Sequence, residues 1–132
     1  MPYQFGKYSI PDHQVFYEGE HCYAMVNTKP IRPNHLLVCP KRQVKDFSKL
    51  RTEELQEMMR IASLISRELG GVCSLAIQDG PDAGQTVEHV HVHVIPRAAD
   101  RVLQVDSDRQ ERSEEEMEQE ALELRQRFNL VC

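Results

Sequence analysis

The sequence predicts one α+β domain, residues 1–132, in which a mainly antiparallel sheet packs against two helices. Three observations support this fold class: five short segments favour strands, two longer segments have helical periodicity, and most connections are short. The strand candidates are Gln14–Glu18, Cys22–Asn27, Leu36–Cys39, Ser74–Gln78 and Glu88–Ile95. Short connections favour antiparallel pairing, and the first helix crosses over between the third and fourth strands.

The first predicted helix runs from Thr52 to Leu69 and is amphipathic. Its apolar side chains recur at the spacing of one helical face, and they are Leu55, Met58, Met59, Ala62, Ile65 and Leu69. Thr52 is the expected N-cap, acidic residues occupy the positive first turn, and Gly70 and Gly71 end the helix.

The second predicted helix runs from Glu114 to Phe128, and Ser113 and Glu116 have the spacing of a capping box at its start. One face carries Met117, Ala121, Leu124 and Phe128, which we interpret as core packing. Between the last strand and this helix, residues 98–112 are polar and largely aperiodic, and we expect a mobile connection there.

Composition argues against several classes of partner. The formal net charge of −5 and the sequence pI of about 5.7 disfavour a basic groove for nucleic acid. No apolar run approaches the roughly 18 residues of a membrane span. The N-terminal stretch lacks the apolar core of a signal peptide, and the four cysteines form no C-x-x-C pair. We therefore expect a cytoplasmic or nuclear protein without a nucleic-acid or membrane partner.

Three histidines alternate with valines in VEHVHVHVIPR, residues 87–97. Successive side chains of a strand point to opposite faces, so His89, His91 and His93 share one face and the valines share the other. The valines suit packing against a helix. The histidine face must then lie against something polar.

Three interpretations of the histidine face remain open. The histidines could be incidental in a half-buried strand, or they could bind zinc together with a further ligand such as His35. Alternatively, an imidazole, which is largely neutral at pH 7 because its ordinary pKa is about 6.5, could attack phosphorus while neighbouring rings donate to phosphate oxygens.

A Gly- and Asp-rich loop directly precedes the histidines and favours a phosphate ligand. Gly80 and Gly84 can adopt positive φ and let backbone N–H groups approach an anion closely. The same composition also suits a plain hairpin connection, so the loop supports a phosphate site only together with the histidines. Asp79 and Asp82 are expected to make turn hydrogen bonds rather than to bind a metal ion.

The chain resembles the histidine triad family. Residues 89–94, HVHVHV, have the family's alternation of histidines and apolar residues. Within the family, the chain is similar to the fragile histidine triad branch, whose members hydrolyse dinucleoside triphosphates. The similar segments are Phe5-Gly6, AMVNTKPIRPNHLLVCP (residues 24–40), QDGPDAGQTVEHVHVHVIPR (residues 78–97) and RSEEEM (residues 112–117).

The resemblance implies a five-stranded antiparallel sheet with two main helices, continued into a second copy of the chain in a homodimer. It also implies cleavage of diadenosine triphosphate to AMP and ADP through a covalent nucleotidyl-histidine. His91 would be the nucleophile, with its other ring nitrogen donating to the backbone carbonyl of His89. His93 would contact the α-phosphate oxygens, and His35 and His89 would form a supporting network.

A nucleotide-binding set follows from the same resemblance. Its members are Phe5, Tyr8, Ile10, Asn27, Gln78, Gly84, Gln85, Thr86, Val87 and His93. Asn27 would contact the ribose, Phe5 and Ile10 would line the base pocket, and Gln85 would also take part in catalysis. No metal site in the protein is implied; a divalent cation, Mg²⁺ or Mn²⁺, would accompany the polyphosphate.

Two features depart from animal members of the family. Tyr8 stands where they carry a nucleotide-contacting histidine, and a tyrosine could stack on a base instead. The connection 98–112 is shorter than theirs, and the far nucleotide is expected to lie near it. Related activities stay open: cleavage of nucleoside phosphoramidates, nucleotidyl transfer to phosphate or a sugar phosphate, and nucleotide sensing with slow turnover.

Overall fold

The structure is a computed structural model and describes residues 3–96 and 111–129. Its strands are β1 (Tyr3–Phe5), β2 (Tyr8–Ile10), β3 (Val15–Glu18), β4 (Cys22–Val26), β5 (Leu36–Pro40), β6 (Cys73–Ile77) and β7 (Val92–Pro96). Its helices are α1 (Thr52–Glu68) and α2 (Glu114–Asn129), with the short 3₁₀ helices η1 (Asp12–Gln14), η2 (Phe47–Lys49) and η3 (Pro81–Ala83). The predicted helices and strands are all present, with ends displaced by at most four residues.

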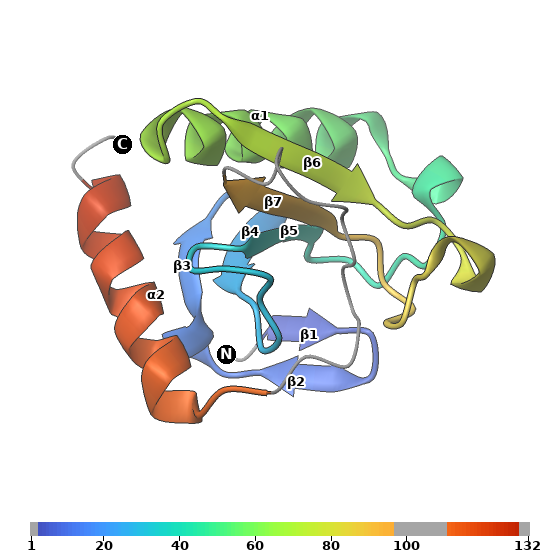
Figure 1. The fold of residues 1–132 in the computed structure, drawn as a ribbon. Helices are drawn as coiled ribbons and strands as arrows, with labels where there is room; N and C mark the ends of the chain where they lie inside the picture. Colours follow the sequence, from blue (N-terminus) through green and yellow to red (C-terminus); the bar gives the residue numbers. More distant parts are fainter. Residues whose placement is uncertain (1–2, 97–110, 130–132) are drawn as a thin grey trace.

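Strands β3 to β7 form one antiparallel sheet in the order β3-β4-β5-β7-β6 (Figure 1). This confirms the predicted α+β class and the five-stranded antiparallel sheet. Helix α1 is the crossover from β5 to β6, and it packs on one face of the sheet against β4, β5 and β7. Helix α2 packs against β3 and β4. No helix among the described residues is long and apolar enough to cross a membrane.

Strands β1 and β2 form a separate antiparallel hairpin that the sequence pattern does not predict. Each strand has three residues, too few for an alternation of apolar and polar side chains to be recognised. Gly6 at the turn has a φ of 59°, which a glycine adopts without strain. The hairpin lies on the side of the sheet away from α1 (Figure 1).

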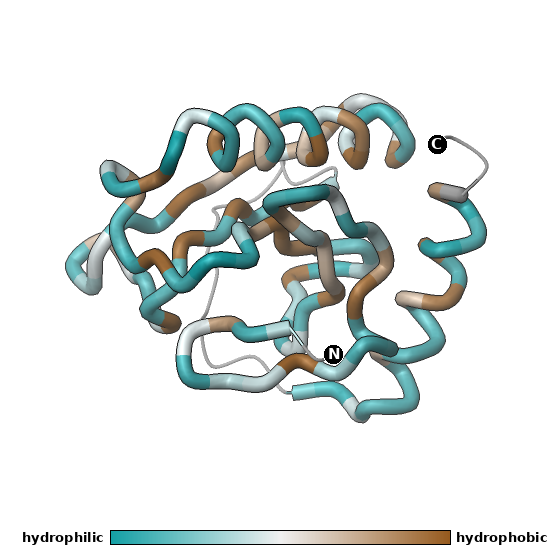
Figure 2. Tube along the Cα trace, turned by 180° about the vertical axis from the view of Figure 1, so that it is seen from behind, coloured by the Kyte–Doolittle hydropathy of each residue, from teal (hydrophilic) through white to brown (hydrophobic). Residues whose placement is uncertain are grey.

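Apolar side chains fill both sides of the sheet. The larger cluster lies between the sheet and the helices and includes Met58, Ile61 and Ile65 of α1 and Phe128 of α2. Figure 2 shows the hydrophobic residues of α1 facing the sheet and its hydrophilic residues facing outward. The smaller cluster lies under the hairpin and contains Phe5, Val15, Tyr23, Met25, Leu37 and Cys39. The three central strands, β4, β5 and β7, are therefore buried on both faces.

Helix α1 differs from the prediction at its start and on one face. Its N-cap is Arg51, not Thr52, because the Glu54 carboxylate reaches back and accepts the Arg51 N–H at 2.8 Å. Leu55 is 37% exposed, since the buried face centres on Met58 and Ile65. The predicted glycine stop is confirmed.

Helix α2 begins with the predicted capping box. The Glu116 N–H donates to Ser113 Oγ at 3.2 Å, and the Ser113 N–H donates to the Glu116 carboxylate at 2.9 Å. Of the predicted mobile connection 98–112, residues 98–110 lie outside the described residues. Arg112, its last residue, is anchored instead, because its backbone N–H donates to the Thr28 carbonyl at 3.2 Å.

Strand β7 begins four residues later than the predicted strand Glu88–Ile95. The His89 N–H donates to the Val87 carbonyl and the Val90 N–H donates to the Val44 carbonyl, both at 2.8 Å. These bonds take the backbone before Val92 out of the ladder with β5 and β6. The predicted alternation nevertheless holds, because Val90 is buried in the cluster beneath α1.

Candidate functional site

The site is built on the face of the sheet that carries the histidines. His93 belongs to β7, His35 immediately precedes β5, and His89 and His91 lie in the segment that leads into β7. All four rings are at least 96% buried. Buried imidazoles require hydrogen-bond partners for their ring nitrogens, and those partners determine where each ring carries its proton.

One chain of hydrogen bonds runs through His35 and His93. The Ile31 N–H donates to His35 Nδ1 at 2.9 Å, so the neutral His35 ring carries its proton on Nε2. His35 Nε2 lies 3.0 Å from His93 Nδ1 and donates to it. The His93 proton is therefore on Nε2, which makes that nitrogen a donor. Asn27 Nδ2 lies 3.2 Å from His35 Nε2, and because both atoms carry hydrogens in this tautomer, the approach is a contact rather than a hydrogen bond.

His91 is oriented by the backbone in the predicted way. Its Nδ1 lies 2.8 Å from the His89 carbonyl oxygen, and only a protonated Nδ1 can donate to that oxygen. When this ring is neutral, its lone pair is then on Nε2. Edge-to-face contacts with Phe5 and His93, at ring-centroid distances of 5.1 and 4.9 Å, hold the ring in place.

His89 is held separately, by the hairpin and by β5. The Gly6 N–H donates to His89 Nδ1 at 2.9 Å, and His89 Nε2 donates to the Pro40 carbonyl at 2.8 Å. Burial lowers the pKa of His89, so its ring is neutral in the folded protein. The two supporting rings are thus held through different partners, His35 through Ile31 and His93, and His89 through Gly6 and Pro40.

A cleft of about 600 Å³ opens beside His91. Of the predicted residues, Phe5, Tyr8, Ile10, Asn27, Thr86, Val87 and His91 line it. Met25, Leu37 and Gln14 also line it, and sequence reasoning did not single them out. Met25 and Leu37 could have been found from strand alternation, because they point to the face opposite the helices.

Other predicted residues do not line the cleft. Gln85 folds back instead: its Oε1 accepts the Gly80 N–H at 2.8 Å and its Nε2 donates to the Lys45 carbonyl at 3.1 Å. Gly84 has a φ of 98°, and a Cβ there would overlap the Gln78 amide. Gln78, Gly84 and Gln85 thus shape the loop before the histidines. His35, His89 and His93 are buried behind His91.

A second hollow, of about 550 Å³, adjoins the cleft. Both hollows share Tyr8, Thr86 and Val87, and the second adds Gly6, Lys7, Gln43 and Glu88. Lys7 Nζ lies 5.4 Å from the centre of the Tyr8 ring, within cation–π distance. Tyr8 is therefore a wall between the two hollows, with a cation beside it.

Among residues 3–96 and 111–129, no group of three His, Cys, Asp or Glu side chains is placed to hold a metal ion. Asp79 accepts the Phe47 N–H at 3.0 Å, which ties its loop to η2 rather than closing a turn within its own loop. The chemistry that the site offers is thus an imidazole nitrogen, His91 Nε2, that the bond to the His89 carbonyl leaves on the other side of the ring, in a residue that lines the cleft.

Comparison with known proteins finds relatives over nearly the whole chain. A bis(5'-adenosyl)-triphosphatase of Dictyostelium discoideum is 42% identical, over 94% of this chain and 91% of its own. A bifunctional bis(5'-adenosyl)-triphosphatase/adenylylsulfatase of Arabidopsis thaliana is 38% identical, over 96% of this chain and 84% of its own.

Solved structures agree with the sequence relatives. The diadenosine triphosphate hydrolase of Plasmodium falciparum superimposes with a TM-score of 0.85 at 34% identity, and the alignment covers 98% of this chain and 85% of that one. The C. elegans NitFhit protein gives a TM-score of 0.83 at 34% identity, over 96% of this chain and 30% of that one. Residues 9–100 match the HIT domain family, and the chain belongs to that family.

Proposed function

We propose that this protein hydrolyses dinucleoside polyphosphates and converts diadenosine triphosphate to AMP and ADP. The names of its relatives support this activity, since two of them are bis(5'-adenosyl)-triphosphatases. The observation that carries the proposal is the position of His91, whose Nδ1 is engaged by the His89 carbonyl at 2.8 Å while the ring lines the cleft.

The reaction has two steps. First, the lone pair of His91 Nε2 forms a bond to the α-phosphorus, and the bond from that phosphorus to the bridging oxygen breaks, so ADP leaves with the electron pair. Water then attacks the same phosphorus and gives up a proton to solvent. The phosphorus–nitrogen bond breaks, AMP leaves, and His91 regains its neutral ring. The nucleophile needs no separate base because an imidazole is largely neutral at pH 7.

The protein stabilises charge on the transferring phosphoryl group mainly by positioning donors. His93 suits this role, because the bond from His35 leaves its proton on Nε2 and its ring lies 4.9 Å from the His91 ring. A divalent cation, Mg²⁺ or Mn²⁺, accompanies the polyphosphate as part of the substrate.

The two hollows suit a substrate with two nucleosides. The apolar part of the cleft, formed by Phe5, Ile10, Met25 and Leu37, accommodates the base of the transferred nucleotide. Asn27 is available to its ribose. The second hollow, beyond Tyr8, lies next to the cleft and offers Lys7 to the departing nucleotide.

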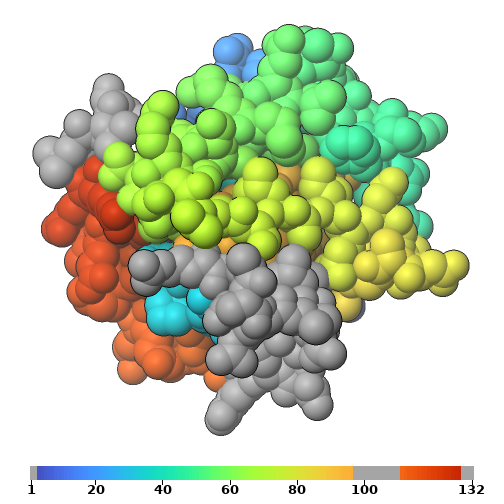
Figure 3. All heavy atoms as spheres, turned by 45° about the horizontal axis from the view of Figure 1, so that its top comes forward, coloured from blue at the N-terminus to red at the C-terminus, as the bar shows by residue number. Residues whose placement is uncertain are grey.

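We further propose a homodimer in which β6 pairs with the β6 of a second copy. β6 is an edge strand of the sheet, and Leu75 at its centre is 52% exposed. Figure 3 shows β6 at the surface beside α1. Unpaired edges favour pairing with another chain. Light scattering after size exclusion measures the state: Leu75→Glu is expected to give monomers, and a wild-type monomer contradicts the proposal.

An isotope experiment tests the mechanism directly. Hydrolysis of diadenosine triphosphate in H₂¹⁸O is expected to place ¹⁸O in AMP and none in ADP, because water attacks the phosphorus bound to His91. Alkaline quenching during turnover, followed by mass spectrometry, is expected to find an adenylyl group on the peptide containing His91. Label in ADP, or an adduct on another residue, contradicts the proposal.

The same assay should include adenosine phosphosulfate and an adenosine phosphoramidate. The first is suggested by the name of the Arabidopsis relative, which is also an adenylylsulfatase. Faster turnover of either compound than of diadenosine triphosphate would change the assigned substrate but not the nucleophile.

A further inference from the structure

The loop from Asn27 to His35, between β4 and β5, carries a proposed site residue at each end. Internal bonds hold part of it: the Lys29 N–H donates to Asn27 Oδ1 at 3.0 Å, and the Ile31 N–H donates to His35 Nδ1 at 2.9 Å. Asn34 has a φ of 65°, a left-handed conformation that costs free energy in a residue other than glycine. The loop therefore needs support from outside.

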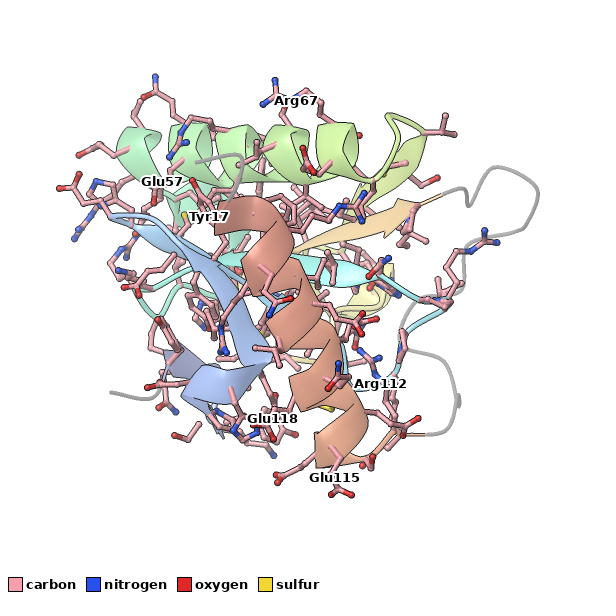
Figure 4. All side chains as sticks on the ribbon, turned by 90° about the vertical axis from the view of Figure 1, so that its left-hand side faces the viewer. Tyr17, Glu57, Arg67, Arg112, Glu115 and Glu118 are labelled. Carbon is pink, nitrogen blue, oxygen red and sulfur yellow. The ribbon has the colours of Figure 1, made fainter. Side chains whose placement is uncertain are left out.

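Arg112, just before α2, supports the first end of the loop. Its Nε and Nη2 donate to the Asn27 carbonyl at 3.0 and 2.7 Å, and its backbone N–H donates to the Thr28 carbonyl at 3.2 Å. Figure 4 shows Arg112 beside the first turns of α2, and Glu115 marks the end at which this helix begins. A planar guanidinium can make such paired bonds, and an ammonium cannot.

Glu120 of α2 supports the second end. Its Oε2 accepts the Asn34 N–H at 3.1 Å, and its Oε1 accepts Arg112 Nη2 at 2.6 Å. The two charged side chains are only 16% and 13% exposed, so water screens their attraction little. One ion pair thus connects both ends of the loop to α2.

We propose that Arg112 and Glu120 are positioning residues for the reaction. Through the Asn27 carbonyl and the Asn34 N–H they hold Asn27 against the nucleoside and His35 against His93. The inference rests on the proposed function for its kinetic consequences, but the geometry that it concerns exists in the free protein.

The two ends predict different kinetic effects. Arg112→Lys keeps the charge opposite Glu120 but loses the paired bonds to Asn27, so it is expected to raise KM about tenfold with a smaller change in kcat. Glu120→Ala removes the acceptor for the Asn34 N–H, so it is expected to lower kcat about tenfold. Glu120→Gln retains an acceptor there and is expected to restore most of kcat.

The pair of Arg42 and Glu54 supplies a matched control. Arg42 also bridges a buried carboxylate and a backbone carbonyl: its Nε and Nη2 donate to Glu54, both at 2.8 Å, and Nη2 donates to the Lys49 carbonyl at 3.1 Å. This pair lies at the start of α1. Arg42→Lys is expected to lower Tm about as much as Arg112→Lys and to leave KM and kcat unchanged.

Nuclear magnetic resonance of the histidine rings gives a readout in the free protein. ¹⁵N–¹H correlations through the ring report the tautomers, and Glu120→Ala is expected to shift the His35 and His93 signals, whereas Arg42→Lys should not. A wild-type protein that does not cleave diadenosine triphosphate refutes the proposed function alone. Unchanged ring signals in Glu120→Ala, or kinetic losses in Arg42→Lys equal to those in Arg112→Lys, overturn the positioning role.

Discussion

Residues 89–94, which lead into β7 and form its first part, have two faces that are equally buried but held by different forces. The exposed fractions are 2, 1 and 0% for Val90, Val92 and Val94, and 0, 4 and 0% for His89, His91 and His93. The valines pack against the helices through contacts without direction. Each histidine makes a directed hydrogen bond through a ring nitrogen.

This difference separates stability from chemistry. The apolar face contributes by removing surface from water, and a side chain there can be exchanged for another of similar volume. On the histidine face the bonds determine which nitrogen is protonated, so no other side chain reproduces the arrangement. Changes on the valine face should lower the free energy of unfolding, and changes on the histidine face should lower kcat.

The largest expected effect is on the histidine face. His91→Asn removes the nucleophile while its amide can still bond the His89 carbonyl, so kcat should fall about 10⁴-fold or more. AMP affinity, measured by calorimetry, should be nearly unchanged. Val92→Ala is the control on the other face: it should lose roughly 2 kcal/mol of stability and keep its kcat. A His91→Asn variant with a tenth of wild-type turnover would rule out His91 as nucleophile.

The largest stability effect is expected on the helix side. Phe128 is 1% exposed and packs against Phe16 and Tyr17 at ring-centroid distances of 5.5 and 6.3 Å. Phe128→Ala should lower the free energy of unfolding by about 3–5 kcal/mol, because it leaves a cavity. Urea unfolding measures the loss. A large fall in kcat at a temperature where the variant is folded would contradict the separation of the two faces.

A smaller effect is expected in the loop before the histidines. Gly84→Ala combines a φ of 98° with overlap of the Gln78 amide, whereas Gly80→Ala has the same φ and open space around the new Cβ. Both should lose about 1–2 kcal/mol of stability from strain. Only Gly84→Ala should also lower kcat, since it displaces Gln78. Equal kinetics in the two variants would show that the position of Gln78 does not matter.

The smallest expected effect is on the pH dependence of the free energy of unfolding, which should fall in two separate pH ranges. Burial lowers the pKa of His89, and the nearby His91 lowers it further, against the bond to Pro40. Below about pH 6.5, the ordinary value, the unfolded chain binds a proton that the folded chain does not. The free energy of unfolding should therefore decrease as the pH falls below that value.

Glu57 contributes to a second loss of stability, at more acidic pH. Burial raises its pKa, but three backbone N–H groups, those of Glu20, His21 and Cys22, donate to the carboxylate and lower the pKa overall. The stability from these bonds is present above the ordinary value of 4.5 and is lost as the pH falls below it. Urea unfolding across both pH ranges measures the two losses. Glu57→Gln should reduce only the acidic loss, to which Glu18 and Glu54, whose pKa values are also lowered, contribute as well. A change in the loss below about pH 6.5 would contradict its assignment to His89.

Much of the fold could be predicted because its signals are local. The face of α2, its capping box and the glycine stop of α1 depend on residues within a few positions of one another. The elements that were not predicted, η1 and the β1–β2 hairpin, are too short for their side chains to show a period. The resemblance carried by residues 78–97 and 24–40 supplied the site residues, but not which of them line the cleft.

The sequence by itself determined that three imidazoles share one face of a strand, because side chains alternate there whatever the strand's neighbours are. Only the tertiary structure decided what each ring does. Gly6 and Pro40 supply the partners that assign the proton of His89, and Arg112 reaches Asn27 across 85 positions. Such bonds depend on which strands become neighbours, and no local pattern encodes that.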